Sequence, residues 1–232
     1  MCNKWNIEEK FKELKLKIDT AMYNAGRCGD TISVIAVSKG QNVDKINTLY
    51  NLGHKDFGEN YIQELEKKRI ALQSKCPKIR WHYIGNIQTN KILHIVRNFS
   101  VHSVSSLKQS KALSKCSNIK DPLNIFLQVN LKNENHKKGF LENELILNIL
   151  EIYKLKNLKL QGLMAVLPLE KDNKNKFWFL KLKSIRNKLY EKLMIKSLKL
   201  SIGMSKDFEE AIKYGSTCIR IGSMIFGPRF KK

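Results

Sequence analysis

The sequence predicts an α/β fold, a single (β/α)8 barrel preceded by one extra helix. Eight short runs rich in β-branched and aromatic residues alternate with stretches of helical periodicity. Strict alternation of strands and helices predicts a parallel sheet, and eight such units close a TIM-like barrel. The length of 232 residues lies in the range of such a barrel, so we expect residues 1–232 to form one domain. An open doubly wound sheet is the alternative if one short run is not a strand.

The eight predicted strands are short apolar runs that end near glycine, serine or asparagine, as buried parallel strands do. In chain order they are Thr31–Ser38, Lys55–Gly58, Arg80–Gly85, Val101–Val104, Asn124–Asn130, Leu158–Val166, Leu198–Ile202 and Thr217–Ile221.

The segments around these strands have helical patterns. A helix is expected before the first strand, at about Trp5–Ala25. Asp207 followed by Glu210 is typical of a capped helix start, and Gly53 and Gly215 are typical of helix ends. One long helix is predicted by apolar residues spaced three and four apart, namely Trp178, Leu182, Ile185, Leu189 and Leu193.

The formal net charge of +22 invites a nucleic-acid interpretation, but the distribution of charge disfavours it. The basic residues are mostly lysines spread over every predicted helix, and aromatic residues do not interleave with them. Lysine, asparagine and isoleucine all have codons rich in A and T, so codon bias alone would give this composition. We therefore expect weak, salt-sensitive adhesion to nucleic acid and no specific site for it.

The sequence also predicts the environment of the protein. No apolar run reaches the roughly 18–20 residues that cross a bilayer, and residues 1–17 mix apolar residues with charges of both signs. We expect a cytoplasmic protein without membrane contact. The five cysteines and five histidines are widely scattered, which predicts neither disulfides nor a metal site.

Three segments that carry chemistry fall at the predicted carboxyl end of the barrel, where active sites of this fold lie. Lys39 follows the first strand, the segment Ser201–Ser205 follows the seventh, and Arg220–Gly227 ends the eighth. In the last two segments Gly203, Ser205, Gly222 and Ser223 have the composition of a phosphate cradle.

A lysine across the barrel mouth from such a cradle predicts a phosphorylated carbonyl compound held as an imine. Lysine forms imines only as the neutral amine, which burial and a nearby cation such as Arg220 favour. Taken singly, each feature has an ordinary explanation: a solvated lysine, a turn, an ion-paired arginine. Their convergence at one end of the fold supports the hypothesis.

The sequence resembles the pyridoxal phosphate homeostasis proteins, which are relatives of the N-terminal barrel of alanine racemase. The matching motifs extend from Ile35 to Gly227. They are Ala36-Val37-Ser38-Lys39, Phe57-Gly58-Glu59-Asn60-Tyr61, Trp81-His82-Tyr83-Ile84-Gly85, Gln88-x-Asn90-Lys91, Gly162-Leu163-Met164-Ala165, Gly203-Met204-Ser205-x-Asp207 and Arg220-Ile221-Gly222-x-x-Ile225-Phe226-Gly227.

The resemblance implies pyridoxal 5′-phosphate (PLP) linked as a Schiff base to Lys39, with Arg220 facing the pyridine nitrogen. It implies that Ser201, Gly222 and Ser223 help to hold the phosphate, and that Asn60 lines the pocket. His82, beside a tryptophan on a strand, is expected to be structural. The chain departs from the family at Gly40, where a threonine or a bulky residue is usual, at Ser105, where an aspartate is usual, and after Ala165.

The resemblance leaves open whether the protein is an enzyme or a carrier. An arginine beside the pyridine nitrogen keeps that nitrogen unprotonated, which weakens the cofactor as an electron sink. Racemase relatives take a second base from a C-terminal domain, for which a chain ending at Lys232 has no room. Tyr61 and Tyr83 are possible substitutes.

We therefore assign no catalytic residue and expect a monomer or weak dimer. Its expected role is to buffer PLP and to deliver it to PLP-requiring apoenzymes. The alternative is a PLP-dependent amino-acid racemase with weak or narrow activity.

Overall fold

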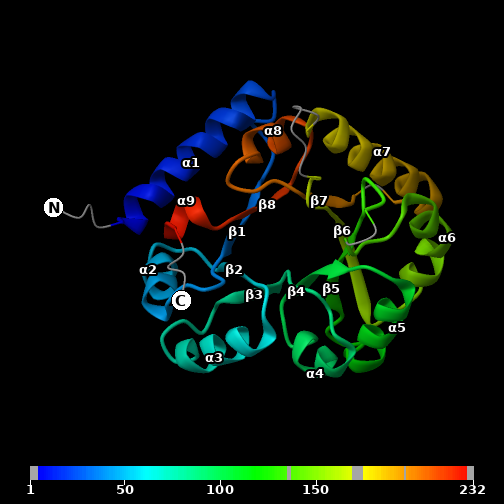
Figure 1. Cartoon of the computed structure of the whole chain (residues 1–232), viewed down its shortest axis with the longest axis horizontal. Coiled ribbons are helices and arrows are strands. Elements are labelled where there is room, and N and C mark those ends of the chain that lie inside the picture. The colour runs from blue at the N-terminus through cyan, green and yellow to red at the C-terminus, as the bar shows by residue number, and fades with distance from the viewer. Residues whose placement is uncertain (1–4, 135–136, 169–174, 196, 229–232) are drawn as a thin grey trace.

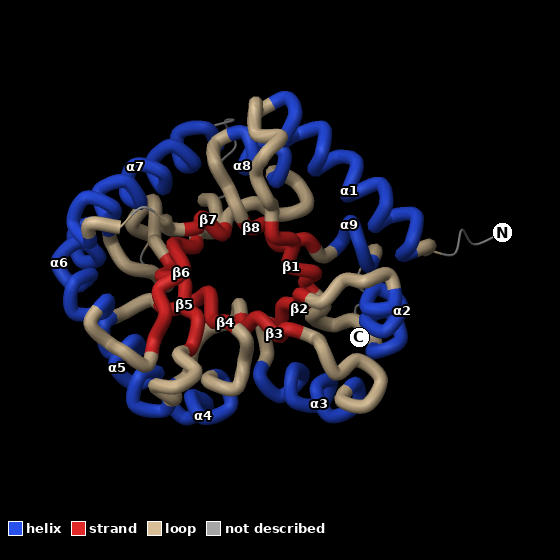
Figure 2. The backbone as a smooth tube through the Cα atoms, turned by 180° about the vertical axis from the view of Figure 1, so that it is seen from behind, coloured by secondary structure: helices blue, strands red, loops and turns tan. Residues whose placement is uncertain are grey.

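The computed structural model describes residues 5–134, 137–168, 175–195 and 197–228. Eight parallel strands form a closed barrel in the order β1 to β8, and helices surround it (Figures 1 and 2). The barrel closes where β1 pairs with β8, with Ala36 opposite Ile221. This confirms the predicted fold and excludes the open sheet.

Every predicted run overlaps an observed strand. The strands are β1 (Ser33–Val37), β2 (Asp56–Glu59), β3 (Arg80–Tyr83), β4 (Ser100–Val104), β5 (Leu123–Gln128), β6 (Leu158–Met164), β7 (Lys199–Ser201) and β8 (Cys218–Ile221). Several predicted runs extend past the strand ends, because the next residues are also apolar and buried. Val129, Ala165 and Ile202 are of this kind.

The helices lie outside the barrel. They are α1 (Ile7–Asn24), α2 (Val43–Asn51), α3 (Ile62–Leu72), α4 (Ile92–Ile95) after a 3-10 turn (Thr89–Lys91), α5 (Leu107–Cys116), α6 (Glu142–Tyr153), α7 (Asn175–Leu193), α8 (Phe208–Lys213) and α9 (Ser223–Phe226). All five residues that predicted the long helix are buried on α7.

The extra N-terminal helix completes the outer layer. The Asn6 side chain caps α1 by accepting hydrogen bonds from the N–H groups of Glu8 and Glu9. Its apolar face is buried, and α1 packs against α8 and α9 (Figure 1). Because α9 has only four residues, α1 occupies the place of a full-length helix after the last strand.

Two helix ends are confirmed, and one helix start differs from expectation. Gly53 and Gly215 follow α2 and α8 with φ of +89° and +99°, the left-handed conformation that ends helices. Asp207 does occupy the N-cap of α8, but its side chain makes no capping bond. Its carboxylate instead accepts from the Met204 N–H at 2.6 Å. Because the preceding loop donates to this carboxylate oxygen, the oxygen is not used to cap the first N–H groups of α8.

The strands separate an apolar layer under the helices from a more polar interior. In β8, Ile219 and Ile221 belong to the apolar core, whereas Arg220 between them bonds to Ser201 of β7. His82, Ser100 and His102 also bond to one another. Within the described residues, no helix is long and apolar enough to cross a membrane.

Candidate functional site

The eight candidate residues gather on one arc of the barrel's carboxyl end. Lys39 follows β1 and Asn60 follows β2. The other six lie in β7 and β8 or just beyond them: Ser201, Gly203, Ser205, Arg220, Gly222 and Ser223. Because β7, β8, β1 and β2 are consecutive neighbours in the barrel, parallel pairing brings segments far apart in the sequence to one edge.

Arg220 carries a buried positive charge at this end. It is 6% exposed, and its guanidinium donates to the Ser201 carbonyl at 2.6 Å, the Ser201 hydroxyl at 2.9 Å and the Ala165 carbonyl at 2.9 Å. Burial lowers the pKa of Arg220, but a guanidinium stays charged in proteins. Since these three acceptors are neutral, the charge remains able to stabilise an electron-rich atom of a ligand.

Ser201, which the family resemblance places at the phosphate, is buried in the barrel interior. Its side chain is fully buried, and its hydroxyl bonds both to Arg220 and to Nδ1 of His102, the latter at 3.0 Å. As an inward-facing residue at the end of β7, it orients Arg220 from inside the barrel. The Ser201 hydroxyl bonds to Arg220, and the role at the phosphate that the family resemblance implies for it stays a prediction.

The two glycine-serine loops lie side by side after β7 and β8. Gly203 has φ of +107°, and a Cβ there would lie 2.8 Å from Cβ of Ala211, so the position requires glycine. Gly222 precedes the first turn of α9, and Ser223 is exposed at its start. The first N–H groups of a helix have no acceptor within it, so this turn presents donors at the barrel mouth.

A buried ionic cluster holds the backbone just before Lys39. Ser38 is fully buried, and its hydroxyl donates to Oε1 of Glu59 at 2.6 Å. Lys68, which is 5% exposed, donates to the Ser38 carbonyl at 2.6 Å and to Oε1 of Glu59 at 2.7 Å. Burial raises the pKa of Glu59, and the charge of Lys68 opposes that rise. Strand, helix and turn are thereby linked at the position from which Lys39 projects.

The residue after Lys39 is held by the same cluster. Oε1 of Glu64 accepts from Lys68 and from the Gly40 N–H, both at 2.6 Å. Gly40 has φ of +70°, which glycine adopts readily and a bulky residue does not. The departure at this position therefore fits the turn of this chain. At Ser105, the other departure, the N–H and the hydroxyl both donate to Oε1 of Gln109.

Sequence reasoning did not assign Glu59, Glu64 or Lys68. The available signal was the position of Lys68 on α3. It lies on the buried face of that helix with Ile62, Leu65 and Leu72, where a lysine is expected only with a partner. In a chain with so many lysines, this one was not distinguished from the solvated majority.

Two buried acceptor atoms lie at the end of β2, one in its last residue and one in the residue that follows it. Oδ1 of Asn60 and Oε2 of Glu59 have no hydrogen-bond partner within the described part of the chain. Such an atom costs about 1–3 kcal/mol unless a donor reaches it. The Asn60 acceptor therefore fits a site that a ligand completes.

The two candidate tyrosines differ in their freedom to act as a base. The Tyr83 side chain is buried, its hydroxyl donates to the Asn86 carbonyl at 2.8 Å, and burial raises its pKa. Tyr61 is 62% exposed at the start of α3. The hydroxyl of Tyr83 is thus already engaged, whereas Tyr61 is largely exposed to solvent.

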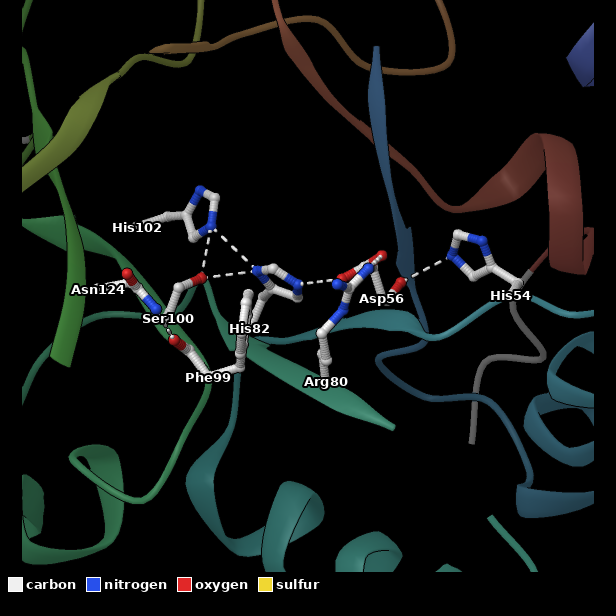
Figure 3. Close-up of polar contacts among 8 residues, drawn as sticks. All are labelled: His54, Asp56, Arg80, His82, Phe99, Ser100, His102 and Asn124. Carbon is white, nitrogen blue, oxygen red and sulfur yellow. Dashed lines mark hydrogen bonds and ion pairs between the residues drawn. The ribbon is translucent and has the colours of Figure 1, made fainter. Parts of the chain in front are cut away.

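His82 is a buried, bonded histidine of the barrel interior. Its Nε2 lies 2.9 Å from Oδ1 of Asp56, and its Nδ1 lies 2.6 Å from Oγ of Ser100 (Figure 3). Burial lowers its pKa, with the hydrogen bond to Asp56 opposing that effect. Both ring nitrogens are therefore engaged in hydrogen bonds within the barrel.

Comparisons with known proteins identify the family of the chain. The family described as "Alanine racemase, N-terminal domain" matches residues 14–229. The pyridoxal phosphate homeostasis protein of Pseudomonas aeruginosa is 37% identical over 226 residues, which cover 96% of both chains. That of Haemophilus influenzae is 33% identical over 231 residues, 97% of this chain and 96% of the relative. The chain belongs to the pyridoxal phosphate homeostasis protein family.

Solved structures extend the comparison for this family member. PipY of Synechococcus elongatus PCC7942, solved with PLP bound, is 26% identical with a TM-score of 0.85, and the match covers 96% of this chain and 100% of PipY. An alanine racemase of Clostridium difficile 630 is 12% identical with a TM-score of 0.74, covering 98% of this chain and 61% of the racemase. The latter likeness shows the shared fold alone.

Proposed function

We propose that this protein binds PLP as a Schiff base on Lys39 and acts in PLP homeostasis in the cytoplasm. The observation that carries the proposal is the buried guanidinium of Arg220, which shares one arc of the barrel mouth with Lys39 and two glycine-serine loops. The names of the relatives and the PLP bound in PipY support the same ligand.

The residues present fit the parts of PLP. Arg220 offers a hydrogen-bond donor to the pyridine nitrogen, an atom with a lone pair. Gly222 and Ser223, with the loop from Gly203 to Ser205, offer N–H and hydroxyl donors to the phosphate. The unpaired oxygen of Asn60 offers an acceptor to a donor group of the ligand. When bound, PLP supplies an aldehyde that reacts with amines.

Lys39 forms the covalent link by condensation with the aldehyde, which releases water. The neutral Nζ adds to the aldehyde carbon, a C=N bond forms, and the aldehyde oxygen leaves as water. The buried cluster of Ser38, Glu59 and Lys68 fixes the backbone from which Lys39 reaches the ligand. Hydrolysis reverses the link, which suits a protein that buffers PLP and releases it to PLP-requiring apoenzymes.

The environment of Tyr83 favours a carrier role over the racemase alternative. A racemase needs a second base, and the hydroxyl of Tyr83 is already bonded to the Asn86 carbonyl. We therefore expect no exchange of the Cα proton when the PLP-loaded protein is incubated with alanine in D2O. Exchange above the rate of free PLP would favour the racemase alternative.

The experiment that tests the proposal is the absorbance spectrum of the protein after incubation with PLP. We expect a visible Schiff-base band that borohydride removes, with the reduced cofactor mass on the peptide that contains Lys39. Lys39→Ala should lack the band. Lys108→Ala, which removes an exposed lysine at the start of α5, should keep it. A colourless wild type, or a reduced adduct on another lysine, would overturn the proposal.

A further inference from the structure

A second pocket opens at the opposite, amino end of the barrel. It has a volume of about 150 Å³ and is lined by the first residues of six strands. These are Ser33, Asp56, Arg80, Ser100, Lys199 and Cys218. None of them is among the residues assigned to PLP, so the barrel has a cavity that the proposed function does not use.

The inner walls of this pocket are apolar and aromatic. Ile35, Phe99 and Phe126 line it. Phe126 stacks on the ring of His102, with centroids 4.1 Å apart and planes inclined by 15°, and Phe99 packs edge-on against His82. The two phenylalanines thus offer flat hydrocarbon surface to a ligand, and the rings of His82 and His102 that they contact also line the pocket.

Three acceptor oxygens in the pocket are already hydrogen-bonded. Oδ1 of Asp56 bonds to His82, and Oδ2 bonds to the Arg80 guanidinium (Figure 3). The amide oxygen of Asn124 accepts from Gln161 at 2.8 Å. These oxygens are therefore less available to a donor group of a ligand.

The pocket retains one uncompensated positive charge. Lys199 is exposed at its rim, and its side-chain ammonium group has no hydrogen bond or ion pair among the residues that the structure describes. The charges of Asp56 and Arg80 cancel, while burial lowers the pKa values of His82 and His102 and keeps both rings neutral. Burial likewise raises the pKa of Cys218 to about 11, so its thiol carries no charge.

The backbone fixes Lys199 at this rim. A Cβ at Gly162 would lie 2.0 Å from the Lys199 carbonyl oxygen, so β6 and β7 approach closely only because residue 162 is glycine. Gly162 pairs directly with Lys199 in the sheet. The position of Lys199 at the rim is therefore built into the strand pairing.

We propose that the amino-end pocket binds a small monocarboxylate of about six non-hydrogen atoms, the size that a cavity of this volume accepts. Its carboxylate lies toward Lys199, and its hydrocarbon part lies against Phe99 and Phe126. A second negative charge is disfavoured, because Asp56 would repel it. The apolar walls favour a carboxylate with a hydrocarbon tail over a compact inorganic anion.

A bound carboxylate would border a hydrogen-bonded chain that crosses the barrel interior. His82 lies 3.2 Å from His102, both contact Ser100, and Nδ1 of His102 lies 3.0 Å from the Ser201 hydroxyl. Ser201 in turn accepts from Arg220. The pocket is thereby connected to the opposite end of the barrel, although binding in it does not depend on PLP.

The test uses the full chain without PLP and follows the ring carbon-proton signals of its histidines by NMR at constant ionic strength. The probe is n-butyrate, and butyramide is the uncharged control of the same size. We expect saturable shifts of the His82 and His102 signals, with a dissociation constant on the order of 1 mM. Butyramide should bind about tenfold more weakly, as expected for the loss of one charge-assisted contact.

Two matched variants assign the charge that binds. Lys199→Gln should weaken butyrate binding about tenfold, whereas Lys17→Gln, on the exposed face of α1, should leave it unchanged. The proposal is overturned if butyrate causes no saturable shift of these two signals up to about 20 mM. It is also overturned if butyramide binds equally well, if inorganic phosphate binds more tightly, or if the two variants behave alike. Each of these outcomes leaves the PLP proposal intact, because Lys39 takes no part in the measurement.

Discussion

At the carboxyl end of the barrel, Lys68 is buried and donates to three acceptors, whereas at the amino end Lys199 is exposed and has no ion pair within the described residues. The first lysine belongs to a cluster that shapes the turn around Lys39. The second lies at the rim of a pocket whose other charges cancel. The same residue type thus serves the fold at one end, and at the other remains available to a ligand.

The largest effect that this contrast predicts is on stability after loss of Lys68. In Lys68→Met the fully buried carboxylate of Glu59 loses its cation, and the free energy of unfolding should fall by about 3–5 kcal/mol. The double variant Lys68→Met/Glu59→Gln should recover part of that loss, because no buried charge then remains unpaired. Guanidinium denaturation measures both. If Lys68→Met lowers the free energy of unfolding by less than about 1 kcal/mol, as expected for a surface ion pair, Lys68 does not stabilise the fold more than an exposed lysine does.

A smaller effect on the free energy of unfolding is expected when the pH is lowered. The histidines at the amino end and Glu59 at the carboxyl end should change it in opposite directions. Burial lowers the pKa of His82 and of His102 in the folded chain. Below pH 6.5 these histidines are therefore protonated in the unfolded chain before they are protonated in the folded chain. These histidines do not lower the free energy of unfolding above pH 6.5. Below that pH, each lowers it by up to about 1.4 kcal/mol per pH unit. The raised pKa of Glu59 acts oppositely, since the folded carboxyl binds a proton first as the pH falls.

The measurement is urea denaturation between pH 7 and pH 5.5, in the wild type and in His102→Gln. The wild type should lose about 2–3 kcal/mol over this range, and the variant should have a shallower slope because one depressed histidine is gone. Half-buried His54, whose pKa is also lowered by desolvation, contributes to both slopes alike. Equal slopes in the two proteins would mean that His102 does not resist protonation.

The smallest expected effect is that of Lys199→Gln on stability. Because the lysine is exposed and unpaired in the described structure, the free energy of unfolding should stay within about 0.5 kcal/mol of the wild type. Lys17→Gln provides the comparison. A loss beyond about 1 kcal/mol in Lys199→Gln alone would show that Lys199 stabilises the fold, and the pocket would then have no spare charge.

The candidate site was largely predictable because it follows strand ends. Lys39 follows a strand with a clear apolar pattern and Arg220 belongs to another, and the carboxyl ends of parallel strands meet at one edge. The bond of Ser201 to Arg220 was not predicted, because residue type shows that a hydroxyl is present but not which way it points. Lys68 was missed because its meaning depends on Glu59, a partner contributed by another element.

The sequence by itself determined the number and order of strands and helices, because hydrophobic periodicity is a local property that can be read residue by residue. It also carried the motifs that connect the chain to its family. The tertiary structure alone decided that α1 completes the helical layer beside the short α9, that Ser201 lies beneath Arg220, and that the first residues of six strands enclose a pocket. These features depend on the closure of the barrel between β1 and β8 and on the register of its strands, and such long-range pairing leaves no mark on local periodicity.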